Sequence, residues 1–196
     1  MSGSATKGIS RGVTLASLLL LAGPAMARDR WQRSLDRGEI LVYTRSAARG
    51  PEVVVKAVID AAPERVWRLV SQCNHYRQTM LRIKAAREIS RRDSEVICRV
   101  TVDMPFPYSD LTATTRAIHR AGPEQYSRRW ELINGDYKVN RGSWVLTPYR
   151  GDRRRTLVVY RAQAVPKAWV PDWIRRKAQQ SSLPDLIRHL RGQLRS

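Results

Sequence analysis

Two-residue periodicity from Ile83 onward constrains the fold more than any other feature of this sequence of 196 residues. Within residues 94–103, the side chains of Val96, Cys98, Val100 and Val102 alternate with mostly polar neighbours. Alternation of this kind is typical of strands that bury one face. The pattern predicts strands at about residues 83–91, 94–103, 108–120, 124–133, 136–148 and 155–164. Because the connections between them are short, we expect an antiparallel meander.

Glycine-containing dipeptides mark the turns of this meander. Asn134-Gly135 predicts a two-residue hairpin of type I′, because both central positions of that turn need a positive φ. Gly122-Pro123 and Gly151-Asp152 predict two further turns.

Two strands and a helical region are expected before the meander. Residues 39–45 and 52–60 are rich in β-branched side chains and predict strands. A helix is expected to begin at Pro63, because a first helical turn tolerates proline. Apolar side chains then recur at helical spacing as far as Cys73, and a short helix or turn is expected at residues 75–81.

The C-terminal region returns to helical periodicity. Residues 166–181 and 182–194 both place apolar side chains at helical spacing, and Pro184 is expected to split or kink this terminal helix. A sheet that buries one face needs a covering layer, and the terminal helix is the only long element left to supply it. We therefore predict an α+β fold, in which a curved antiparallel sheet wraps around the terminal helix and leaves a space between them.

Five segments, taken in order, resemble one known family. They are Val58–Trp67 with its Pro-Glu-x-Val-Trp pattern, Met104–Asp110, Gly142–Pro148, Thr156–Tyr160 and Pro166–Leu194. Together they resemble the START-like proteins of the polyketide cyclase and lipid-transport (SRPBCC) superfamily. The resemblance implies the helix-grip fold, a hydrophobic cavity and a START-like ligand-binding domain over residues 39–196. One departure is Leu111-Thr112, where many relatives have Arg-Asp, so no role of that arginine is transferred to this chain.

The resemblance leaves two classes of function open, because one fold hosts transporters, cyclases and plain binding proteins. We expect non-enzymatic binding or transport of a lipid or other hydrophobic ligand by a monomer, with no cofactor, metal or catalytic residue. The alternative is a polyketide cyclase or dehydratase that acts on an aromatic substrate. Asp103 and Asp110 could do acid–base work in such an enzyme, but we interpret them as solvated charges at the base of a loop.

The first 27 residues have the layout of a secretory signal peptide. Lys7 and Arg11 precede an uncharged apolar run over residues 13–22, and Ala25-Met26-Ala27 gives a small-x-small cleavage pattern. We therefore predict a signal peptide at residues 1–27, cleaved near Ala27, and a periplasmic or secreted protein that begins with a polar helical lead-in at residues 28–38. An uncleaved N-terminal anchor is the alternative.

Export affects how the cysteines and the charge are interpreted. Cys73 and Cys98 could pair in an oxidising compartment or remain buried thiols. The chain has 36 Lys+Arg against 17 Asp+Glu, a net charge of +19, and loss of Lys7 and Arg11 with the leader would leave +17. For an exported protein, this charge favours an anionic membrane surface over nucleic acid as the partner.

Apolar and aromatic side chains on the predicted strands and terminal helix are the candidate cavity lining, although the aromatic ones could equally form core. The predicted lining is Val100, Val102, Trp130, Leu132, Trp144, Leu146, Val158, Tyr160, Trp169, Trp173 and Ile174. Arg116, Arg128 or Arg141 could point inward and hold an anionic headgroup, since arginine suits bidentate recognition.

The mouth of the cavity is predicted from an apolar hairpin tip and a basic helical segment. Met104 and Phe106 lie in the sequence Met-Pro-Phe-Pro, and an exposed apolar tip needs a reason. The resemblance matches this tip to a flexible loop that closes the cavity mouth together with the terminal helix, so it implies that Met104 and Phe106 are the gate. The alternative is a tip that packs against the terminal helix. Arg175, Arg176 and Lys177 are the predicted membrane contact, since each basic residue near an anionic surface contributes about 1 kcal/mol.

Overall fold

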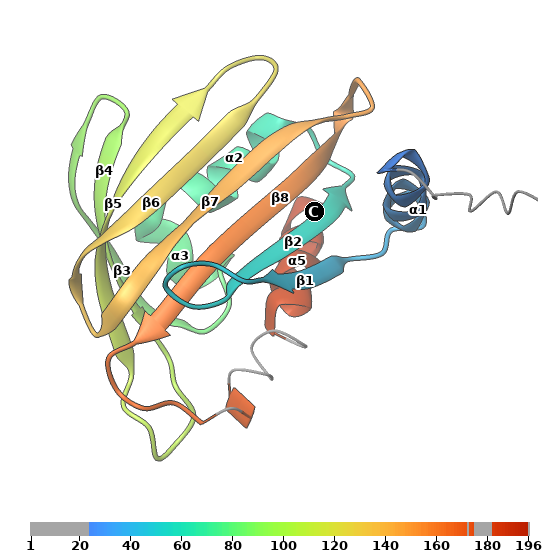
Figure 1. Cartoon of the computed structure of the whole chain (residues 1–196). Coiled ribbons are helices and arrows are strands. Elements are labelled where there is room, and N and C mark those ends of the chain that lie inside the picture. The colour runs from blue at the N-terminus through green and yellow to red at the C-terminus, as the bar shows by residue number, and fades with distance from the viewer. Residues whose placement is uncertain (1–23, 172, 175–181, 196) are drawn as a thin grey trace, which may run out of the picture.

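A curved, eight-stranded antiparallel sheet forms the centre of the computed structural model, which describes residues 24–171, 173–174 and 182–195 (Figure 1). Its strands are β1 (Leu41–Arg45), β2 (Glu52–Ile59), β3 (Ile83–Arg92), β4 (Glu95–Val102), β5 (Leu111–Ala121), β6 (Tyr126–Gly135), β7 (Tyr137–Tyr149) and β8 (Asp152–Pro166). The order across the sheet is β1-β2-β8-β7-β6-β5-β4-β3. The predicted meander from β3 to β8 is therefore confirmed, and its last strand returns to pair with β2.

Helices pack against both faces of this sheet. The inner, concave face carries α2 (Pro63–Ser71), the short η1 (Cys73–His75), α3 (Tyr76–Thr79) and α5 (Leu183–Arg195) (Figure 1). On the outer face lies α1 (Pro24–Asp36), whose Leu35 packs in one cluster with Val58 of β2. Ala57 and Ile59, the neighbours of Val58 on β2, belong to the inner core, so α1 and α5 lie on opposite faces of the sheet.

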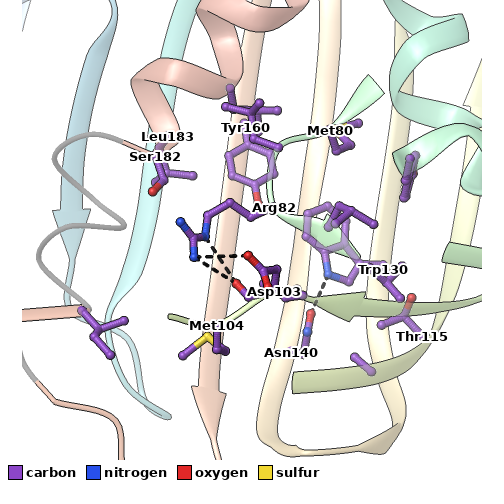
Figure 2. Close-up of a pocket in the computed structure, with 18 of the residues that line it drawn as sticks. Met80, Arg82, Asp103, Met104, Thr115, Trp130, Asn140, Tyr160, Ser182 and Leu183 are labelled. Carbon is purple, nitrogen blue, oxygen red and sulfur yellow. Dashed lines mark hydrogen bonds and ion pairs between the residues drawn. The ribbon is translucent and has the colours of Figure 1, made fainter. Parts of the chain in front are cut away.

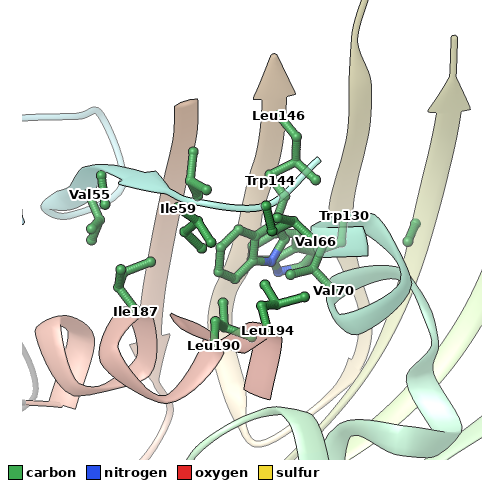
Figure 3. Close-up of a cluster of buried hydrophobic side chains, with 14 residues drawn as sticks. Val55, Ile59, Val66, Val70, Trp130, Trp144, Leu146, Ile187, Leu190 and Leu194 are labelled. Carbon is green, nitrogen blue, oxygen red and sulfur yellow. The ribbon is translucent and has the colours of Figure 1, made fainter. Parts of the chain in front are cut away.

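The main core lies between the sheet, α2 and α5 (Figure 3). Ile187, Leu190 and Leu194 are buried at positions i, i+3 and i+7 of α5, and this spacing forms one apolar stripe on the helix. The same cluster includes Val66 and Val70 of α2 and the strand residues Val55, Ile59, Trp144 and Leu146. The C-terminal helix is thus the inner layer of a helix-grip α+β fold, as predicted.

A disulfide between Cys73 and Cys98 joins η1 to β4, and the two Cα atoms are 6.1 Å apart. Both cysteines are buried in a small cluster with Tyr76. The sequence left open whether the two cysteines pair or remain buried thiols, and in the structure they pair.

The turn type predicted at Asn134-Gly135 is wrong. Asn134 is not among the residues with positive φ, which a type I′ turn would require. The ladder between β6 and β7 ends at the pair Glu131 and Arg141, and Asn134 and Gly135 pair with β5 instead. A Cβ on Gly135 would lie 2.2 Å from the carbonyl oxygen of Thr112, so glycine at this position permits close contact with β5.

The predicted helix over residues 166–181 begins too early. β8 continues through Pro166, because the start of β7 extends beside it and pairs Tyr137 with Pro166, and residues 167–171 are not helical. Residues 175–181 lie outside the described residues. α5 then begins at Leu183 with Pro184 in its first turn, where proline has no helical hydrogen bond to lose.

The N-terminal helix α1 covers most of the predicted lead-in at residues 28–38, and Gly38, with φ of +78°, follows its end. α1 begins before the predicted cleavage site at Ala27. Residues 1–23, which hold most of the predicted signal peptide, lie outside the described residues. Among the helices that the structure describes, none is long and apolar enough to cross a membrane.

Candidate functional site

A cavity of about 370 Å³ lies between the inner face of the sheet and the C-terminal segment. Strands β4 to β8 contribute one wall, residues 80–83 after α3 contribute a second, and Trp173, Ile174 and Leu186 border it from the C-terminal side (Figure 2). The volume is near the lower end of the roughly 300–1,000 Å³ that is typical of small-molecule sites.

Three aromatic rings form the apolar floor of this cavity. The sheet register pairs Trp144 with Tyr160, whose ring centroids are 4.3 Å apart, and Trp130 stacks on Tyr160 at 6.0 Å. The indole Nε1 of Trp130 donates a hydrogen bond to Oδ1 of Asn140 at 3.0 Å, which satisfies the only polar atom of that ring (Figure 2). Burial raises the pKa of Tyr160 to about 12, so its hydroxyl stays protonated at neutral pH.

Arg128 is the buried cation of the cavity wall. Its side chain is only 5% exposed, and its guanidinium lies over the ring of Trp130 at 5.2 Å and over that of Tyr76 at 5.6 Å. Nε has no hydrogen-bond partner, and no residue that the structure describes forms an ion pair with the guanidinium. The hydroxyl of Tyr76 is itself occupied, since it donates to the carbonyl oxygen of Val70 at 2.7 Å.

His119 lies opposite Arg128 in the register of β5 and β6, and it contacts the ring of Trp67 edge-on at 5.1 Å. Burial, followed by the positive charge of Arg128, lowers the pKa of His119 to about 4. The imidazole is therefore neutral at pH 7, and its Nε2 has no hydrogen-bond partner.

The mouth of the cavity is bordered by the loop between β4 and β5, with Met104 and Pro105 in the lining. Asp110 fixes the base of this loop, because it accepts hydrogen bonds from Lys84 Nζ at 2.5 Å and from the Met104 backbone N–H at 3.2 Å. The bond to Lys84, and then that to Met104, lowers the pKa of the Asp110 carboxyl. Asp103 pairs separately with Arg82 (Figure 2), so each of the two acids that flank the loop has its own cation.

Exposed aromatic side chains lie on the β4–β5 loop and on the segment that precedes α5. Phe106, at the loop tip, is 96% exposed, so it does not pack against the terminal helix as the alternative prediction had it. Trp169 and Trp173 are 78% and 48% exposed. The β4–β5 loop and the segment that bears these tryptophans lie at the same end of the molecule in Figure 1, and both contribute to the cavity wall.

The structure brings most of the predicted lining together. The predicted lining residues that border the cavity are Val100, Val102, Trp130, Trp144, Tyr160, Trp173 and Ile174, and the predicted gate residue Met104 borders it as well. Of the three candidate arginines, Arg128 faces the cavity, Arg116 is exposed, and Arg141 bonds Gln163 through Nε at 2.7 Å. The predicted membrane contact at residues 175–177 lies outside the described residues.

Four predicted lining residues lie elsewhere. Leu146 and Val158 are fully buried in the core under α2 and α5, because they occupy the strand ends on which these helices pack. Leu132 packs in a separate cluster that includes Tyr137, beyond the point where β6 and β7 separate. Trp169 is exposed, because residues 167–171 do not form the predicted helix.

The wall that follows α3 and the contribution of α5 were not among the residues predicted from the sequence. Tyr76 and Met80 line the cavity at i, i+4 spacing, and Leu183 and Leu186 line it from α5 at i, i+3 spacing. These helical spacings were the available signal, but they do not distinguish a cavity from a core. Within the described part of the chain, no three His, Cys, Asp or Glu side chains gather as metal ligands would.

Residues 59–191 match the family model described as polyketide cyclase / dehydrase and lipid transport, which is more than half of the chain. Among curated proteins, none matches the sequence significantly.

Solved structures show the same fold at low sequence identity. A STAR-related lipid transfer protein from Xanthomonas axonopodis is 20% identical with a TM-score of 0.68, over 80% of this chain and 94% of that one. Human StAR-related lipid transfer protein 5 is 12% identical with a TM-score of 0.69, over 87% and 92%. The Zhui aromatase/cyclase from Streptomyces sp. R1128 is 17% identical with a TM-score of 0.58, over 78% and 94%.

Proposed function

The chain belongs to the polyketide cyclase / dehydrase and lipid-transport family, and from this premise we propose that it binds a hydrophobic small molecule or lipid in the cavity between the sheet and α5. The observation that supports this most is the floor of Trp130, Trp144 and Tyr160, which presents apolar surface to an unfilled space of about 370 Å³. Well-packed interiors leave few voids larger than a water molecule, so a space of this size suits a ligand.

We propose binding or transport rather than catalysis. A cyclase would need an acid or base that faces the ligand with a suitable pKa. Asp103 and Asp110 are each paired with a cation outside the aromatic floor, and burial keeps the Tyr160 hydroxyl protonated. The fold shared with an aromatase/cyclase keeps the enzyme as the alternative proposal.

We propose that the protein works outside the cytoplasm. The predicted signal peptide at residues 1–27 is the first support. The second is the disulfide between Cys73 and Cys98, since structural disulfides persist in oxidising compartments.

We further propose that the mouth contacts an anionic membrane and that Met104 and Phe106 gate the exchange of ligand. Phe106 and Trp173 are exposed apolar side chains beside the opening, as membrane-inserting residues need to be. The predicted basic segment Arg175-Arg176-Lys177 and the net charge of +19 favour an anionic surface.

Nile red, a neutral hydrophobic dye, tests the binding proposal. Val100 lines the cavity, so Val100→Phe should fill part of it and weaken dye binding. Val159, which alternates with buried Val158 and lies on the outer face of β8, supplies the matched control Val159→Phe. We expect wild type and Val159→Phe to bind the dye alike and Val100→Phe to bind less. Equal binding by all three proteins, or no binding by wild type, would contradict the proposal.

A further inference from the structure

Arg128 is a fully charged group in a place where charge is costly. Arginine is always protonated in proteins, and burial of an unpaired ion costs several kcal/mol. Yet Arg128 is only 5% exposed and borders the cavity, and its guanidinium has neither an ion pair nor a hydrogen bond with any described residue. The rings of Trp130 and Tyr76 offset only part of this cost, because a cation–π contact contributes about 0.5–2 kcal/mol.

The groups around Arg128 supply no negative charge. His119 is neutral or positive at every pH. Glu88, the acid whose charge reaches this region, already bonds Arg91 through both carboxylate oxygens, at 2.9 and 2.6 Å. The hydroxyl of Tyr76 donates to a backbone carbonyl and stays protonated, because burial raises its pKa. Among the described residues that line the cavity, the one acid is Asp103, which pairs with Arg82 at 3.7 Å and not with Arg128. The guanidinium of Arg128 therefore presents donors to the cavity without an anionic partner in the wall.

We propose that Arg128 binds the oxyanion of an amphipathic ligand, a carboxylate or a phosphate, while the apolar part of the ligand lies on Trp130, Trp144 and Tyr160. This inference rests on the proposed ligand-binding function and adds the chemical class of the ligand. The planar guanidinium donates two parallel hydrogen bonds to a carboxylate or phosphate, which a neutral ester or alcohol cannot accept in the same way. The volume of about 370 Å³ suits one chain or compact ring system.

Matched probes separate the oxyanion from the hydrocarbon. One pyrene-labelled chain is prepared as a fatty acid, as its methyl ester and as a lysophosphatidate, and each is bound to the whole protein at pH 8. We expect wild type to bind the acid or the lysophosphatidate about tenfold to hundredfold more tightly than the ester, the range for hydrogen bonds to a charged group. The tighter of the two anionic probes identifies the source of the oxyanion.

Arg128→Met should remove this preference, so that the acid, the lysophosphatidate and the ester bind with similar affinity, because methionine keeps the length of the side chain without its charge. Arg129→Met is the matched control, since Arg129 is the next residue on β6 and is exposed on the outer face. Arg128→Lys should retain part of the preference, because lysine keeps the charge but loses the bidentate geometry.

The outcomes distinguish this inference from the function on which it rests. If wild type binds acid, lysophosphatidate and ester equally, the role of Arg128 is wrong and the cavity still binds apolar ligands. A preference that persists in Arg128→Met overturns the role of Arg128 as well. If wild type binds none of the probes and no Nile red, the proposed function itself fails. Should Arg128→Met not fold, the preference of wild type and its reduction in Arg128→Lys still decide the matter.

Discussion

Gly142 lies directly across the β6–β7 ladder from Trp130, and a Cβ at Gly142 would lie 2.4 Å from the indole ring. The same Cβ would lie 2.2 Å from the backbone carbonyl oxygen of Arg161. The position of Trp130 on the floor of the cavity therefore depends on the absence of a side chain on the neighbouring strand. Asn140, also on β7, holds the indole Nε1.

Gly142→Ala should displace Trp130 and lower both stability and ligand binding. We expect a loss of about 1–3 kcal/mol in the free energy of unfolding, the usual cost of overpacking, together with weaker Nile red binding. Gly192→Ala is the control, because no atom lies within 4 Å of its added Cβ and alanine favours a helix by about 0.5–1 kcal/mol over glycine. Urea unfolding of both variants measures the difference. A Gly142→Ala protein as stable as wild type would show that the strands move apart easily.

The disulfide should contribute substantially to stability. Cys73 and Cys98 are separated by 25 residues, and closing a loop of that length restricts the unfolded chain by roughly 3–4 kcal/mol. The double variant Cys73→Ala/Cys98→Ala should therefore have a free energy of unfolding lower by that amount and a lower urea midpoint, and reductant should destabilise only wild type. Coincident urea curves for the double variant and the oxidised wild type would contradict this expectation.

Strand positions could be predicted from the sequence because periodicity reports burial directly. The sequence could not predict which end of a strand meets a helix and which end meets a cavity. Val158 and Tyr160, for example, lie two residues apart on the same face of β8, but Val158 is in the core and Tyr160 lines the cavity. Likewise, Arg116, Arg128 and Arg141 all lie in predicted strands, and the sequence does not show which of them points inward. Only the register of the strands places Arg128 on the inner face. The turn type at Asn134-Gly135 was predicted wrongly because the sequence does not distinguish a glycine that permits close contact between strands from a glycine in a turn.

Phe106 should influence ligand exchange far more than stability. It is 96% exposed, so Phe106→Ala should change the free energy of unfolding by no more than about 0.5 kcal/mol. Transfer of a fluorescent lipid from anionic donor vesicles should slow, and it should slow further in Phe106→Asp, because a carboxylate resists desolvation.

Ile89 provides the control for this test. It is 53% exposed on β3, so Ile89→Asp adds the same charge away from the β4–β5 loop. Wild-type transfer rates in Phe106→Asp, or equal slowing in Ile89→Asp, would remove Phe106 from the mechanism.

Stability should fall as the pH drops from about 6.5 to about 4 because of His119. Its pKa is about 4 in the folded protein and about 6.5 in the unfolded chain, so between these values only the unfolded chain binds the proton. Above pH 6.5 this proton does not affect the free energy of unfolding, and at pH 4 its binding to the unfolded chain lowers that free energy by at most roughly 3 kcal/mol. His119→Gln should lose this part of the pH dependence in urea unfolding at pH 7 and pH 4.5. An unchanged difference between the two pH values would show that other groups cause it.

Native mass spectrometry of the protein purified from its own host tests the central proposal most directly. The account predicts a species heavier than the polypeptide by the mass of a hydrophobic small molecule, which solvent extraction releases and which Val100→Phe reduces. A protein that has only its polypeptide mass, and that takes up no lipid from a total extract of the same cells, would contradict it.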